Sequence, residues 1–75
     1  MPLPRPLVTI SSDYLGGVPV FTGTRVPVKA MFDYLEGGEP LEAFLKQFPD
    51  VEQLHAVAVI RMARERVAPA MEAAE

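Results

Sequence analysis

Apolar residues recur at helical spacing through the second half of the chain, whereas turn residues interrupt short apolar runs in the first half. Three stretches place apolar side chains close to the i, i+3, i+4, i+7 repeat of one helix face. Their apolar members are Val28, Met31, Phe32 and Leu35; Leu41, Phe44, Leu45 and Phe48; and Leu54, Val57, Ala58 and Met62. Glycine and proline separate the stretches. The pattern therefore predicts three consecutive helices joined by tight turns.

The residues between the stretches indicate where each helix begins and ends. Pro27 and Pro40 are expected at the first helical position, where the missing N–H has no partner to lose. Gly37-Gly38 ends the first helix, because glycine readily takes the left-handed conformation that closes a helix. Asp50 is expected to cap the third helix, which continues to about Val67.

The third helix carries a local conflict. Residues 56–60 alternate as a strand does, and valine and isoleucine favour strands. The preceding cap and the stripe from Leu54 to Met62 favour a helix instead. Such a helix is apolar nearly all round before Arg61, which predicts burial on two sides, with a partner on the second.

Two short extended runs, residues 7–10 and 18–22, precede the helices. Two short strands are not stable alone in water, so they must lie on the helices or pair across a dimer.

We expect residues 1–6, with prolines at alternate positions, to be a flexible leader and residues 69–75 to be a frayed tail. The predicted fold is mainly α: a single domain over residues 7–68, in which a short β-containing N-terminal arm precedes a three-helix, helix-turn-helix-like bundle.

Composition narrows the possible functions. A chain of 75 residues with 49% hydrophobic residues forms one small domain, and such a domain often shares its core with a second copy or another protein. The chain has no cysteine and one histidine, which argues against a disulfide framework or a metal site. A net charge of −3 argues against binding nucleic acid by bulk attraction. No run is long enough for a membrane span or typical of a signal peptide, so we expect a cytoplasmic protein.

Catalysis is not expected. The one histidine, His55, is interpreted as a partly exposed residue near the edge of the third apolar stripe. No serine or carboxylate stands at a spacing typical of a catalytic array. We therefore predict a protein that is not an enzyme and has no cofactor or small-molecule substrate.

A short helix, a tight turn and a longer helix also form the pattern of a DNA-binding helix-turn-helix. Four residues of the third helix are candidates to contact operator DNA: Gln53, His55, Arg61 and Arg64. A recognition helix usually reads bases with its N-terminal residues, and here Asp50 and Glu52 stand at that end. DNA binding by a monomer is thus expected to be weak, although the arginine faces of a homodimer would add up.

The block Gly23-Thr24-Arg25 stands where the extended arm enters the first helix. Glycine there suits a positive φ or a close approach. Thr24 is expected to bond backbone groups, as a cap or a turn residue. Arg25 either pins the arm to the bundle or contacts a partner protein or a phosphate.

This block is part of a longer motif. Residues 16–28 read Gly-Gly-Val-Pro-Val-Phe-Thr-Gly-Thr-Arg-Val-Pro-Val and resemble the hallmark of the domain-of-unknown-function 433 family. The resemblance continues through Leu35-Glu36-Gly37-Gly38 and Phe48-Pro49-Asp50 and spans about residues 8–65. The motif positions are Gly17, Pro19, Gly23, Thr24, Arg25 and Pro27, with a partner-binding or a structural role.

The resemblance implies a small helix-turn-helix-like protein that serves as the antitoxin of a prokaryotic toxin–antitoxin pair. Such a protein binds and silences a PIN-like ribonuclease and can repress its own operon as a dimer. The alternative is a homodimeric helix-turn-helix transcriptional regulator that has no toxin partner. A homo-oligomer with a purely structural role is a third reading.

Overall fold

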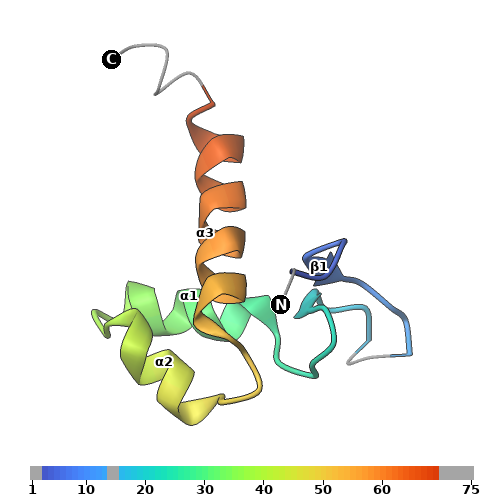
Figure 1. Cartoon of the computed structure of the whole chain (residues 1–75), viewed down its shortest axis with the longest axis horizontal. Helices are drawn as coiled ribbons and strands as arrows, with labels where there is room; N and C mark the ends of the chain where they lie inside the picture. The colour runs from blue at the N-terminus through green and yellow to red at the C-terminus, as the bar shows by residue number, and fades with distance from the viewer. Residues whose placement is uncertain (1–2, 14–15, 70–75) are drawn as a thin grey trace.

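The computed structural model describes residues 3–13 and 16–69, and its helices follow the predicted repeats (Figure 1). The chain forms β1 (Val8–Thr9), β2 (Val20–Phe21), α1 (Val28–Glu36), α2 (Leu41–Gln47) and α3 (Gln53–Val67). The expected mainly helical fold with three helices and a short β-containing arm is therefore confirmed. Most of the predicted frayed tail and the first two residues of the predicted leader lie outside the described residues.

Each helix begins later than predicted. Pro27 and Pro40 have extended backbones and precede the first helical residue instead of occupying it. Glu52, not Asp50, is the residue before α3, and its side chain makes no capping hydrogen bond. The expected Asp50 cap is wrong because the chain makes one further turn, in which the Val51 N–H donates to the Phe48 carbonyl at 3.0 Å. That turn buries Val51 before α3 begins.

The two strands form an antiparallel pair in which Val8 lies opposite Phe21 and Thr9 opposite Val20. Val20 also makes an antiparallel bridge to Pro27, so β2 is flanked on both sides by extended backbone. Beside the pair, the hydroxyls of Thr9 and Thr22 lie 2.7 Å apart and share a hydrogen bond. The strands are shorter than the predicted runs, but they lie on the helices, which was one of the two arrangements expected.

The core joins β2 to all three helices. Its five largest fully buried side chains are Phe21, Phe44, Met31, Val20 and Val59. The Phe44 ring lies 6.0 Å from Phe21, 5.8 Å from Tyr34 and 5.0 Å from Phe48, measured between ring centroids. Only the N-terminal half of α3 lies beside the other elements, and its C-terminal half extends beyond them (Figure 1). This projecting helix sets the geometry of the candidate site.

Candidate interaction surface

The turn after β2 is built by Thr24. Its hydroxyl donates a hydrogen bond to the Phe21 carbonyl at 2.8 Å and accepts one from the Val26 N–H at 3.0 Å. Its own N–H donates to the same Phe21 carbonyl at 2.9 Å. Gly23 has a φ of 86°, in the left-handed region that side chains disfavour. Of the two roles expected for Thr24, the structure therefore shows the turn residue.

Replacing Thr24 with valine should destabilise the fold by about 1–2 kcal/mol, because two hydrogen bonds of the turn are lost at nearly constant volume. Thr24→Ser keeps the hydroxyl and should lose less than about half of that. Urea unfolding followed by circular dichroism measures both variants. Equal stability of Thr24→Val and the wild type would contradict a structural role for this hydroxyl.

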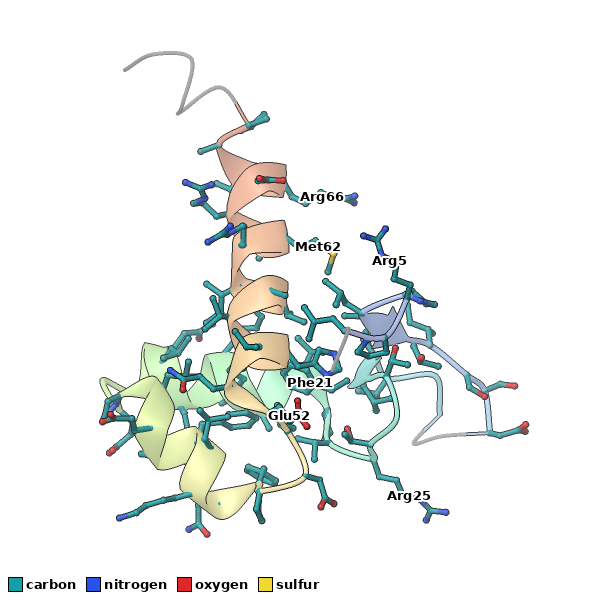
Figure 2. All side chains as sticks on the ribbon, viewed as in Figure 1. Arg5, Phe21, Arg25, Glu52, Met62 and Arg66 are labelled. Atoms are coloured by element: carbon teal, nitrogen blue, oxygen red, sulfur yellow. The ribbon has the colours of Figure 1, made fainter. Side chains whose placement is uncertain are left out.

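The other motif positions surround this turn. The Pro19 carbonyl accepts a hydrogen bond from the Val28 N–H at 3.0 Å, which ties the start of α1 to the residue before β2. Pro27 bridges to β2, and Gly17 lies in the turn that precedes it. Arg25 is exposed, and its side chain extends away from the body of the protein (Figure 2). Most residues of the motif thus shape the backbone between β2 and α1, and one charged side chain, Arg25, lies on its outer side.

His55 is a buried residue of α3, so the expectation of a partly exposed histidine is wrong. Its side chain is 5% exposed, and its Nε2 lies 2.8 Å from the Leu7 carbonyl oxygen. A carbonyl only accepts, so the Nε2–H is the donor in this bond. The ring also meets Phe21 edge to face, with a centroid distance of 5.2 Å. This histidine fastens the arm to α3 and is not on the surface that would meet DNA.

The apolar residues of α3 lie on two sides, but the predicted stripe is not the buried side. The core face consists of His55, Ala56 and Val59. A second side, which we call the outward face, consists of Leu54, Val57, Ala58 and Met62; it meets the core face at Met62, which lies about two turns after His55. Leu54 is 68% exposed and Met62 is 41% exposed, whereas Val57 and Ala58 are half-buried. The repeat that predicted the helix therefore marks its solvent side.

Two open hollows flank this face. One, of about 420 Å³, is lined by Leu7, Leu54, Val57, Ala58, Arg61, Met62 and Glu65. The other, of about 500 Å³, is lined by Val57, Ile60, Arg61, Arg64 and Glu65. Met62 and Arg66 project from the side of α3 on which Arg5 lies (Figure 2). The surface thus combines apolar side chains with a charged border of arginines and Glu65.

The remaining candidates for DNA contact, Gln53, Arg61 and Arg64, are all exposed on α3. Arg64 lies 3.9 Å from Glu65 in a surface ion pair. Asp50 and Glu52 are exposed at the other end of the helix. Acidic groups therefore stand at the start of α3, and arginines together with Glu65 stand toward its end.

A second surface ion pair lies on α1. On α1, hydrogen bonding to Asp33, together with the negative charge of that carboxylate, raises the pKa of Lys29. Their closest atoms are 2.9 Å apart in an exposed i, i+4 pair, which adds little to stability. Within residues 3–13 and 16–69, no three histidine or acidic side chains are grouped closely enough to bind a metal. None of the helices in this part of the chain is long and apolar enough to span a membrane.

These features describe a small helical domain with an N-terminal two-stranded sheet and a projecting third helix. The chain belongs to the DUF433 family, a family of proteins of unknown function, whose model matches residues 8–63. It is similar to the uncharacterized protein y4eO of Sinorhizobium fredii (strain NBRC 101917 / NGR234), with 39% identity over 57 residues. The match covers 73% of this chain and 26% of that relative, so the chain spans about a quarter of its length. No solved structure matches the chain significantly.

Proposed function

We propose that this protein is the antitoxin of a prokaryotic toxin–antitoxin pair, which binds a PIN-like ribonuclease and silences it. The observation that carries the proposal is the outward face of α3. Leu54, at 68% exposed, leaves most of a leucine side chain in water, and Val57, Ala58 and Met62 extend the apolar surface along the helix. Contiguous exposed apolar surface bordered by charge is typical of a protein-binding site.

Charge supports the same kind of partner. The chain carries a net charge of −3. A ribonuclease binds a polyanion and needs a basic surface to do so, and opposite charges accelerate association and favour the correct partner. The exposed acidic residues at the start of α3, Asp50 and Glu52, are therefore suited to a basic surface of such an enzyme, whereas the arginines beside the outward face are not.

The experiment is capture followed by an enzyme assay. Affinity-tagged chain is recovered from its native cells, and proteins present in equal amount are identified by mass spectrometry. The isolated partner is then assayed on a fluorescently labelled single-stranded RNA. We expect the partner to cleave the RNA alone and to lose activity when an equimolar amount of this chain is added. A partner without nuclease activity, or a nuclease that this chain leaves active, would contradict the proposal.

Binding of operator DNA is the second candidate, favoured by the exposed Arg61 and Arg64 on one helix. Phosphate contacts by these side chains would make affinity fall steeply with salt. Titration of a labelled fragment of its own promoter at two salt concentrations tests this function. Arg61→Ala combined with Arg64→Ala should abolish binding. No binding by the wild type would contradict this function, and binding that is insensitive to both salt and these substitutions would exclude these arginines as the contacts.

A further inference from the structure

We propose that the outward face of α3 pairs with the same face of a second copy, in an antiparallel arrangement centred on Ala58. This inference goes beyond the proposed function, and it concerns the chain alone. It depends on three features of α3: the order of large and small side chains, the distribution of charge, and the projection of the helix from the body.

The side chains along the outward face are arranged symmetrically about Ala58. Leu54 lies four residues before it and Met62 four residues after it, so the three form one i±4 ridge of the kind that packs between helices. In an antiparallel pair with Ala58 at the two-fold axis, Leu54 of each copy lies beside Met62 of the other. The small alanine lets the helices approach closely at the axis, and the larger side chains fill the space on either side.

Charge selects the antiparallel direction. Asp50 and Glu52 are exposed just before α3, and Arg61, Arg64 and Arg66 are exposed in its C-terminal half. Glu65 offsets part of the basic charge through its contact with Arg64. An antiparallel pair places the acidic start of each helix beside the basic end of the other, with Asp50 beside Arg66. A parallel pair would bring like charges and like ends of the helix dipoles together.

The position of the helix permits this pairing. The C-terminal half of α3 extends beyond the other described elements (Figure 1), and Met62 and Arg66 project from one side of it (Figure 2). Leu7 and Arg5 lie on the same side and would border the second copy. Because one face cannot hold two occupants, a ribonuclease bound there would displace the second copy, a step that rests on the proposed function.

The test uses disulfide cross-linking, which the chain suits because it has no cysteine. Leu54→Cys and Met62→Cys proteins are mixed in equal amounts, oxidised, and analysed on a non-reducing gel. We expect the mixture to form the mixed dimer at least about tenfold faster than either variant alone forms its own, because residue 54 of one copy is displaced from residue 54 of the other by about 12 Å along the axis. Ile10→Cys mixed with Met62→Cys is the matched control, since Ile10 is also 68% exposed.

Exchanging the charges of Asp50 and Arg66 tests the antiparallel direction independently. Arg66→Glu should raise the dissociation constant of the dimer roughly tenfold, and adding Asp50→Arg should restore it. A monomeric wild-type chain, rapid cross-linking of Leu54→Cys alone, or a mixed yield no higher than that of the Ile10→Cys control would overturn the proposal. These measurements need no partner, so their failure leaves the antitoxin proposal standing, and a failed ribonuclease assay leaves the dimer standing.

Discussion

Replacing Phe44 with alanine is expected to remove about half of the stability of this protein. Phe44 is fully buried and its ring meets Phe21, Tyr34 and Phe48, so it joins α2 to β2 and α1. Truncating a buried phenylalanine costs about 3–5 kcal/mol. A domain of this length has a free energy of unfolding of only about 4–11 kcal/mol.

Thermal unfolding followed by circular dichroism measures this loss. We expect the melting temperature of Phe44→Ala to fall by at least about 12 °C. Val67→Ala is the control, because Val67 is 85% exposed and its truncation should change stability by less than about 0.5 kcal/mol. A shift of less than about 4 °C for Phe44→Ala would contradict the central place of this ring in the core.

Replacing His55 with alanine is expected to cost about 2–4 kcal/mol and to loosen the N-terminal arm from α3. The variant loses the Nε2–H bond to the Leu7 carbonyl, the edge contact with Phe21 and the volume of a buried ring. The Leu7 carbonyl keeps the Thr22 N–H as a donor at 3.0 Å. The loss of stability should therefore be smaller than it would be if the Leu7 carbonyl kept no hydrogen-bond donor.

A second variant at this position, with a control two residues earlier, separates the contribution of the buried ring from that of the hydrogen bond. His55→Phe keeps a buried ring but lacks the donor, and it should recover about half of the stability lost in His55→Ala. Gln53→Ala, on the exposed side of the same first turn, should be close to the wild type. Hydrogen exchange at the Thr22 amide should accelerate in His55→Ala and not in Gln53→Ala. Unchanged exchange and stability in His55→Ala would show that this histidine does not fasten the arm.

The helices could be predicted because the chain marks them locally. The apolar repeats and the flanking glycine and proline residues identify α1 and α2 to within a residue or two of their bounds, and the predicted end of α3 at Val67 is confirmed. The start of α3 was missed because the signal at Asp50 is local. The burial of Val51, which delays the helix, depends on the tertiary core.

The side of α3 that enters the core could not be decided from the sequence. Two apolar sides compete on this helix, and the side with the larger residues, Leu54 and Met62, faces outward. The core takes the side with Ala56 and Val59, which belong to the same buried cluster as Phe21 and Phe44. The spacing of His55, Ala56 and Val59 was available as a signal, but the partner of His55 is a backbone carbonyl 48 residues away, which no local pattern reveals.

The Gly23-Thr24-Arg25 block was likewise predictable only in part. Its position as a turn before α1 was predictable from residue type, and the two hydrogen bonds of the Thr24 hydroxyl give that turn its geometry. The role of Arg25 could not be predicted from the local sequence, and its side chain extends outward from the turn (Figure 2).

Sedimentation equilibrium tests whether two copies of this chain pair through the outward face of α3. Wild type, Leu54→Glu and Ile10→Glu are compared at the same micromolar concentrations. Leu54 and Ile10 are both 68% exposed, so neither substitution should disturb the core, and only the first places a charge on the outward face. We predict twice the mass of one chain for the wild type and Ile10→Glu and a single-chain mass for Leu54→Glu. Equal masses for all three proteins would contradict the pairing of two copies through this face.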